Sequence, residues 1–206
     1  MAIPIRRKLT PDEFFDWLAG QETRYELVDG EPMAMAGAER RHDRIVVNGL
    51  VSLGVQLRGR KCQPFSADTA VRIPSGNIRY PDFGVDCGPF VDKSMTASEP
   101  ALVAEVFSPS SRLFDCTEKL EEYKSVPSLA HIILIDPEWP QARYWWRDVE
   151  GSWQSRRETG LDAVIELAAL ELKVPLADLY TGLEFRPRPM LVDVYPPGTT
   201  EGRWAI

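Results

Sequence analysis

Three acidic residues occupy segments that otherwise have the composition of buried strands. Glu105 lies in the apolar run 101–107, Asp82 follows Pro81 in the segment RYPDFGV, and Glu26 lies in RYELV. A strand as apolar as 101–107 is normally covered on both faces, and an unpaired ionised carboxylate there would cost several kcal/mol. Each of these carboxylates therefore needs a partner, a proton or a nearby cation.

A divalent metal ion between two neighbouring strands would meet this need. Two carboxylates in a medium of low dielectric constant repel each other, so each raises the pKa of the other unless a cation lies between them. Hard oxygen ligands suit Mg²⁺ or Mn²⁺. A nearby ammonium group would complete such a site by orienting or deprotonating a water and by stabilising negative charge on a phosphoryl group.

The segment FDCTEKLEEYK, which follows the Glu105 strand and a polar turn, supplies that ammonium group. Asp115, Lys119 and Tyr123 are four residues apart in turn, so they share one face of a helix. Lys119 follows Glu105 by fourteen residues, so its long side chain can return to the end of the strand. The alternative is a solvent-exposed Asp115–Lys119 pair, worth only a few tenths of a kcal/mol.

The rest of the chain predicts the elements that position these residues. Thr10 is expected to cap a helix that begins at Pro11, and RYELVDGEPMAMAG predicts a hairpin with its turn at Asp29-Gly30. An amphipathic helix is predicted from His42 to Leu57. Further predictions are strands in CQPFSADTAVRI, NIRYPDFGVDC and HIILIDP, a helix at 111–124, a hairpin around Glu150-Gly151, a short strand near Val164-Ile165 and a helical turn at 176–179.

We interpret residues 1–185 as a single domain. Residues 186–206 are rich in proline and show no helical period, so we expect an extended tail or one packed on a partner subunit. The chain of 206 residues has a net charge of −7 and a pI near 5.0, which argues against a general nucleic-acid coat protein. Residues 40–79, however, carry eight Lys or Arg and two Asp, and this basic stretch is either a phosphate-facing surface or an ordinary solvated face.

Cysteine usage and hydropathy predict a cytoplasmic protein with no membrane span. No apolar run approaches the ~18 residues needed to cross a bilayer, and no apolar stretch follows the basic N-terminal residues. Cys62, Cys87 and Cys116 are widely spaced, so we expect three reduced thiols and no zinc site. A cysteine hydrolase using Cys116 and His42 is disfavoured, because no motif orients the pair.

Taken together, RYELVDGE, the RH that opens the second helix, RYPDFGV, EVFSPSS and the spaced Asp115, Lys119 and Tyr123 resemble the Uma2 family. This family comprises bacterial proteins related to restriction endonucleases, within the PD-(D/E)XK nuclease superfamily. The resemblance runs from about Leu9 to Leu183. It implies an α/β (α+β) restriction endonuclease-like fold, with a central mixed sheet flanked by helices and an added N-terminal helix–hairpin.

The resemblance also implies a metal site for Mg²⁺ or Mn²⁺. Asp82 and Glu105 are the implied ligands, and the backbone carbonyl of Val106 is a further candidate. The superfamily pattern places a lysine two residues after the second acid, but Phe107 stands there. The family pattern indicates that this lysine has moved to the following helix, which points to Lys119 as the third catalytic residue.

Further positions also match the family. Glu26 and His42 are implied to bind a second metal or to contact phosphate, and Tyr123 is expected to buttress Lys119. Glu26 has the alternative of pairing with an arginine such as Arg24. His42 lies near a helix N-terminus, where the dipole lowers the pKa of a histidine, so we expect a neutral donor or ligand, or else a packed helix-start residue.

The expected activity is metal-assisted hydrolysis of phosphodiester bonds in DNA, carried out by a homodimer. A different class of function also fits the sequence. The chain could be a non-cleaving nucleic-acid-binding or protein-interaction module that retains a nuclease fold.

Overall fold

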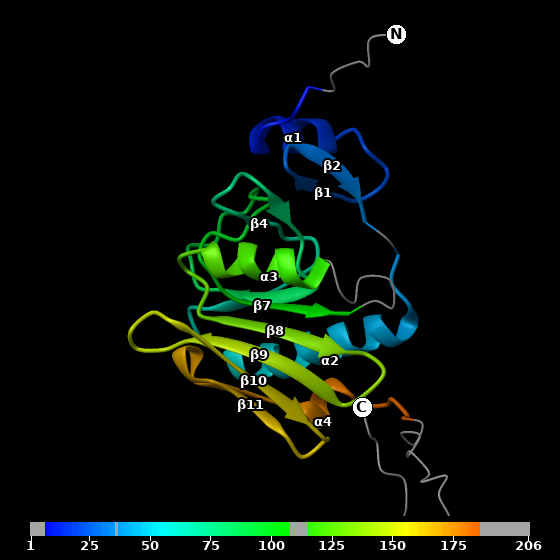
Figure 1. Ribbon diagram of the computed structural model, residues 1–206, viewed down its shortest axis with the longest axis vertical. Coiled ribbons are helices and arrows are strands. Elements are labelled where there is room, and N and C mark those ends of the chain that lie inside the picture. Colours follow the sequence, from blue (N-terminus) through cyan, green and yellow to red (C-terminus); the bar gives the residue numbers. More distant parts are fainter. Residues whose placement is uncertain (1–6, 36, 108–114, 186–206) are drawn as a thin grey trace, which may run out of the picture.

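A six-stranded mixed sheet forms the centre of the protein (Figure 1), seen in a computed structural model that describes residues 7–35, 37–107 and 115–185. The strand order is β10-β9-β8-β7-β6-β3, in which β7 and β8 run parallel and the other neighbours antiparallel. The strands are β3 (Gln63–Ser66), β6 (Phe83–Asp86), β7 (Pro100–Val106), β8 (His131–Asp136), β9 (Gln141–Arg147) and β10 (Trp153–Thr159). The predicted α+β architecture with a central mixed sheet flanked by helices is confirmed.

Strand β7 lies inside the sheet and is covered on both faces. Successive side chains of a strand point to opposite faces, so Leu102 and Ala104 enter one core cluster and Val103 enters the other. Glu105 shares the face of Val103. Helix α3 (Asp115–Ser125) lies in front of β7 on this face (Figure 1), and we call it the α3 face.

Helix α2 (Arg40–Leu57) packs on the opposite face of the sheet. Its buried residues recur at helical spacing: Ile45, Gly49, Leu53 and Leu57. A Cβ atom on Gly49 would lie 2.6 Å from Cζ of Phe83, so glycine permits the close approach of the helix to β6. This contact brings the first turn of α2, with His42, to the residue before Phe83, which is Asp82.

The N-terminal helix–hairpin joins a second sheet with the strand order β2-β1-β5-β4. Thr10 and Glu13 form a capping box at the start of α1, and Asp29 and Gly30 both have positive φ in the tight turn between β1 and β2, as predicted. The elements are α1 (Pro11–Leu18), β1 (Tyr25–Val28), β2 (Glu31–Ala34), β4 (Val71–Arg72) and β5 (Ile78–Arg79). Glu26 on β1 is carried by this module.

The C-terminal part contains one strand that the sequence did not predict. Strands β11 (Val164–Leu167) and β12 (Leu172–Pro175) form a two-stranded sheet, followed by α4 (Leu176–Leu179). A 3₁₀ turn at Ala168–Leu170 separates the two strands. Strand β12 has four residues and ends in proline, so its sequence signal was too short to distinguish from a loop.

The prediction of three reduced cysteines is wrong, because the structure contains a Cys62–Cys87 disulfide. The antiparallel register of β3 and β6 pairs Gln63 with Asp86, which brings the two cysteines together as the next cross-strand pair. No CxxC motif marks this contact, because the residues are 25 positions apart. The inference of a cytoplasmic location from unpaired thiols therefore loses its basis.

Some predictions fall on segments outside the described residues. These are the polar turn at 108–111, the first residues of the predicted helix at 111–124 and the tail at 186–206. Within the described segments, no helix combines the length and the apolar character that crossing a membrane requires.

Candidate active site

Asp82, the residue directly before β6, faces Glu105 of the adjacent strand β7. The antiparallel register of β6 and β7 pairs Phe83 with Ala104, so the residue before Phe83 faces the residue after Ala104. Asp82 Oδ2 accepts a hydrogen bond of 2.7 Å from the backbone N–H of Val106. The two carboxylates therefore meet at the C-terminal end of β7, on the side of the sheet from which α3 follows.

Glu105 receives two groups from α3. Tyr123 Oη donates a hydrogen bond of 2.7 Å to Glu105 Oε1, and Lys119 Nζ lies 3.7 Å from the same oxygen. The side chain of Lys119 is 21% exposed, so the alternative of a solvent-exposed helix pair is wrong. The hydrogen bond of Tyr123 goes to Glu105 rather than to Lys119. Asp115 begins α3, and its side chain lies outside the described part of the structure.

Burial and neighbouring charges shift the pKa of both members of the Glu105–Lys119 pair. The pKa of Glu105 is raised to about 7, chiefly by burial. The positive charge of Lys119 and the hydrogen bond from Tyr123 lower this pKa, whereas the negative charges of Asp82 and Glu26 raise it. Burial lowers the pKa of Lys119, but the carboxylates of Glu105 and Glu26 outweigh it and raise that pKa above its ordinary value. Lys119 is therefore an ammonium group at neutral pH.

Glu26 is tied to three donors. Its Oε1 accepts hydrogen bonds from Lys119 Nζ at 3.0 Å and from the backbone N–H of Tyr80 at 3.1 Å. Its Oε2 accepts one from Arg79 Nη1 at 3.0 Å. Arg79 also binds Glu122 of α3 through Nε and Nη2, so this arginine joins the N-terminal module to α3. Both oxygens of Glu26 are thus engaged within the protein.

The arginine partner of Glu26 is Arg79, and the expectation of Arg24 is wrong. Arg24 instead lies 3.7 Å from Asp68, and both of those side chains are exposed. Arg79 is the buried residue that the sequence reasoning missed. The available signal was its position between Ile78 and Tyr80, because a charged residue within a segment predicted as a strand needs a partner, as does Glu105.

His42 contacts the second carboxylate of the cluster. Its Nε2 lies 3.1 Å from Asp82 Oδ2. Burial lowers the pKa of His42, but the hydrogen bond and charge of Asp82, with the charges of Glu105 and Asp43, raise it overall. The expected lowering by the helix dipole is therefore wrong in sign, because carboxylates lie close to the ring. His42 Nδ1 is buried and has no hydrogen-bond partner among the described residues.

The residues present fit a hard divalent cation held by two carboxylates. Among the described residues, Asp82 Oδ1 and Glu105 Oε2 make no hydrogen bond. Burial, and after it the charges of Asp82 and Glu26, raise the pKa of Glu105, and a bound cation would oppose this by stabilising the ionised carboxylate. The same part of the chain contains no group of three or more His, Cys, Asp or Glu side chains placed to hold a metal ion. Two carboxylates are nevertheless enough for Mg²⁺, which keeps several waters and shares its coordination with substrate phosphates.

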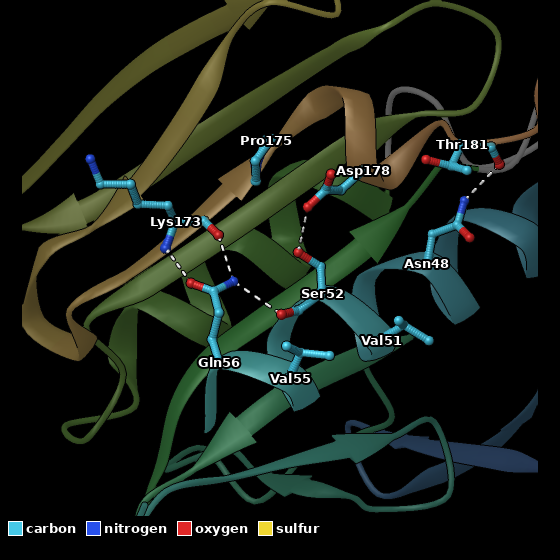
Figure 2. Close-up of a pocket in the computed structure, with 9 residues that line it drawn as sticks. All are labelled: Asn48, Val51, Ser52, Val55, Gln56, Lys173, Pro175, Asp178 and Thr181. Carbon is cyan, nitrogen blue, oxygen red and sulfur yellow. Dashed lines mark hydrogen bonds between the residues drawn. The ribbon is translucent and has the colours of Figure 1, made fainter. Parts of the chain in front are cut away.

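Two surface cavities lie away from the acidic cluster. One of about 530 Å³ lies between α2 and the β12–α4 segment (Figure 2), and one of about 680 Å³ lies between β3 and the 88–98 loop. In the first, Ser52 donates to Asp178, Asn48 donates to the carbonyl of Thr181, and Gln56 bonds the backbone of Lys173. These polar groups join α2 to the C-terminal segment, so they serve the fold.

The chain resembles known proteins along most of its length. The Uma2 family model, described as "Putative restriction endonuclease", matches residues 11–177. Two uncharacterised proteins of Synechocystis sp. are similar: slr1290 is 29% identical over 180 residues, covering 86% of this chain and 94% of its own, and sll1609 is 27% identical over 176 residues, covering 84% and 99%.

A crystal structure from Anabaena variabilis, described as a putative nuclease belonging to DUF820, shares the fold. It matches with a TM-score of 0.67 at 18% identity and covers 83% of this chain and 97% of its own. The matching family model extends over the elements that carry Glu26, Asp82, Glu105 and Lys119. The chain therefore belongs to the Uma2 family, whose description supports a nuclease-like role.

Proposed function

We propose that the protein is a metal-dependent nuclease that hydrolyses phosphodiester bonds in DNA. The observation that carries this proposal is the meeting of Asp82 and Glu105 on adjacent strands, with the ammonium group of Lys119 at 3.7 Å from Glu105. Two carboxylates and a cation at the end of a strand are the groups that metal-assisted phosphoryl transfer needs. The family description and the solved relative give coarser support, for a nuclease-like role.

In this proposal Asp82 and Glu105 hold Mg²⁺ or Mn²⁺. The chemistry supplied there by a bound divalent cation is charge neutralisation at the phosphoryl group and acidification of water. The backbone N–H of Val106 and the ring of His42 both bind Oδ2 of Asp82, so Oδ1 would be the oxygen available to the metal ion. Tyr123 binds Oε1 of Glu105 in the same way and leaves Oε2.

Lys119 acts as a fixed positive charge. Because its pKa is raised, it does not serve as the base that removes a proton from water. Its role is to orient the attacking water and to stabilise the charge that develops on the phosphoryl oxygens. Glu26 holds Lys119 in place through the hydrogen bond of 3.0 Å, and Arg79 holds Glu26. Glu26 and Arg79 are therefore positioning residues rather than metal ligands.

A homodimer is the proposed cutting form, because one site of this kind cuts one strand and two sites are needed for a double-strand break. Analytical ultracentrifugation of the full chain with and without duplex DNA tests this point. A monomer that cuts both strands in a single binding event would contradict it.

One observation favours a second candidate function, a non-cleaving nucleic-acid-binding or protein-interaction module. The acidic cluster is neutralised within the protein by Lys119 and Arg79, as in a structural network. A buried ion-pair network alone is weak evidence for stability, so it does not explain why the cluster is present. A measurement of metal binding distinguishes the nuclease from the non-cleaving module.

Calorimetric titration of Mn²⁺ into the metal-free protein is the first experiment. The nuclease proposal expects binding that is lost in Asp82→Asn and in Glu105→Gln, because each variant removes one ligand charge while keeping the side-chain shape. Asp178→Asn is the matched control, since Asp178 is exposed in the cavity of Figure 2. Absence of binding in the wild type would contradict the metal mechanism and favour the non-cleaving module.

Cleavage of supercoiled plasmid in Mg²⁺ or Mn²⁺ is the second experiment. Lys119→Ala is expected to lower the rate by at least a hundredfold, in the range seen when one preorganised charge is removed. Lys124→Ala is the control on the same helix, because Lys124 pairs with the exposed Glu121. Equal rates for the two lysine variants would exclude the proposed role of Lys119.

A further inference from the structure

The α3 face of the central sheet extends beyond α3 onto the β9–β10 hairpin. In Figure 1, α3 lies in front of β7, whereas the front of β9 and β10 is not overlain by any described helix. Trp145 of β9 is partly buried and packs against the core cluster under α3, which identifies the residues of the hairpin that share this face. They are Gln141, Arg143, Trp145 and Arg147 on β9, and Trp153, Ser155, Arg157 and Thr159 on β10.

Two exposed arginines on this hairpin lie in the same cross-strand row as Glu105. The register pairs Glu105 with Leu134, Leu134 with Arg143, and Arg143 with Arg157. Directly paired residues of neighbouring strands share one face of a sheet. With strands about 4.8 Å apart, the two arginines lie about 10 and about 14 Å from Glu105 along the row.

This arginine pair is unfavourable for folding. Like charges directly opposite each other across two strands are destabilising. Within the described part of the chain, neither guanidinium has an ion pair or a hydrogen bond, and no acidic residue of β9 or β10 shares their face. Arg156, the neighbour of Arg157, points to the other face and is paired with Glu158.

The other arginine on this face is used by the fold. Arg147 donates hydrogen bonds to the carbonyls of Leu129 and Lys124 and stacks on Trp153. Asp136, in the row next to Arg143, accepts a hydrogen bond from the backbone of Glu138. Arg143 and Arg157 thus remain as two exposed positive groups on the face that carries Glu105, and among the described residues neither forms an ion pair; Asp136 of β8 is the acidic residue of this face next to their row.

We infer that Arg143 and Arg157 form a phosphate-binding track for the nucleic-acid strand that is cut at Asp82 and Glu105. Guanidinium groups bind phosphate oxygens in a bidentate manner. The two arginines follow Glu105 at increasing distance along one row, so they can bind successive phosphates of one strand on one side of the scissile bond. An external anion would also relieve the repulsion between the two guanidinium groups. This inference rests on the proposed nuclease function and adds a substrate-binding surface to it.

Fluorescence anisotropy with a labelled 30-base-pair DNA duplex, in the absence of divalent metal, tests the track. We expect Arg143→Gln/Arg157→Gln to weaken binding at least tenfold and to reduce the slope of log K against log salt by about 2, because two phosphate contacts are lost. Arg156→Gln is the matched control. It removes the same charge from the next residue of β10, but on the opposite face, so its affinity is expected to stay within twofold of the wild type.

Cleavage kinetics separate this inference from the proposed function. The double variant is expected to raise KM for duplex DNA while leaving the hydrolysis of bis(p-nitrophenyl) phosphate unchanged, because that small substrate does not reach the hairpin. Its melting temperature is expected to equal or exceed that of the wild type, since a repulsive pair is removed. The charge-preserving variant Arg143→Lys/Arg157→Lys should retain the salt slope.

Each outcome has a distinct meaning. A wild type that cleaves DNA, with an unchanged KM and salt slope in the double glutamine variant, would overturn the track and leave the nuclease proposal intact. A wild type that neither binds nor cleaves would overturn both. If the wild type binds an RNA duplex of equal length more tightly than DNA, and the double glutamine variant loses affinity for that RNA to the same extent, the track would be supported and DNA as the substrate would be contradicted.

Discussion

Tyr123 and Glu105 form a partly buried hydrogen bond of 2.7 Å that links α3 to strand β7 of the central sheet. Tyr123 is fully buried, and its hydroxyl donates to the Glu105 carboxylate. Burial disfavours the ionised form of Glu105. The contact therefore lowers the energy of ionised Glu105, and it occupies Oε1, so that Oε2 is the oxygen left for the proposed metal ion. It also places the helix that carries Lys119 over β7.

Removing this hydroxyl is expected to destabilise the protein. Tyr123→Phe should lower the free energy of unfolding by about 1–3 kcal/mol, because it leaves a buried acceptor with one donor fewer. Urea denaturation measures the change. Tyr80→Phe is the matched control: the Tyr80 hydroxyl is buried without a partner among the described residues, so its removal should be neutral or slightly stabilising. Equal losses in the two variants would exclude a specific role for the Tyr123 bond.

Glu105 is expected to make the metal-free protein less stable as the pH rises. Its pKa is raised from 4.5 to about 7 in the folded state, so folding favours the protonated carboxyl. The stability contributed by that proton is complete below pH 4.5 and is lost between pH 4.5 and about 7, by about 3 kcal/mol.

Glu105→Gln cannot ionise at this position, which makes it the test of this pH dependence. In EDTA, the variant should gain stability relative to the wild type between pH 5 and pH 8, as measured by urea denaturation at both values. A stability difference that is the same at the two pH values would show that Glu105 does not titrate in this range.

The sequence predicted the local part of the fold better than the long-range part. The capping box of Thr10 and Glu13 and the Asp29-Gly30 turn depend on neighbouring residues, so both could be identified without tertiary information. The Cys62–Cys87 pair depends on the register of β3 against β6, and its residues are 25 positions apart. Such contacts leave no periodic pattern in a single sequence.

The candidate site divides in the same way. Lys119 and Tyr123 could be placed on one helix face because the α-helical period determines which side chains point together. The return of Lys119 to Glu105 followed from the short connection, whereas Tyr123 was expected to contact Lys119 and instead donates its hydrogen bond to Glu105. Arg79 could not be placed, because its contact with Glu26 requires β1 and β5 to lie in one sheet and α3 to supply Glu122. The pKa of His42 was predicted with the wrong sign because the distance to Asp82 was unknown.

His131 is expected to make the protein less stable as the pH falls. Tyr144 donates its hydroxyl proton to the carbonyl of Glu166. In the hydrogen bond of 2.8 Å between Tyr144 Oη and His131 Nδ1, the donor is therefore the N–H of the histidine ring, and the hydroxyl oxygen accepts. His131 Nε2 is then unprotonated, and it is buried without a partner among the described residues. Burial lowers the pKa of His131 from 6.5 to about 4.

The folded state disfavours the protonated form of His131. The stability that the neutral ring contributes is therefore present above pH 6.5 and is lost as the pH falls to about 4, by up to about 3 kcal/mol. This sign is opposite to that of Glu105, so the two effects partly cancel in the wild type. His131→Gln should therefore gain stability relative to the wild type from pH 7 to pH 4.5 in urea denaturation. If the stability difference between the variant and the wild type is the same at pH 7 and pH 4.5, the ring of His131 is protonated in both the folded and the unfolded state or in neither.

The Cys62–Cys87 disulfide is expected to stabilise the edge of the sheet. Strand β3 pairs with β6 at this edge, and the disulfide closes a loop with a sequence separation of 25. Loop-closure entropy predicts that Cys62→Ser/Cys87→Ser lowers the free energy of unfolding by about 3 kcal/mol. Dithiothreitol should destabilise the wild type by a similar amount and leave the double variant unchanged.

Thiol titration with Ellman's reagent in denaturant checks the pairing directly. The chain has three cysteines, so one thiol per chain should react without reductant and three after reduction. Three reactive thiols in the unreduced protein, with equal stability of wild type and double variant, would contradict the pairing. That result would restore the expectation of reduced cysteines, and β3 would then be held to β6 by its backbone hydrogen bonds and the packing of Phe65.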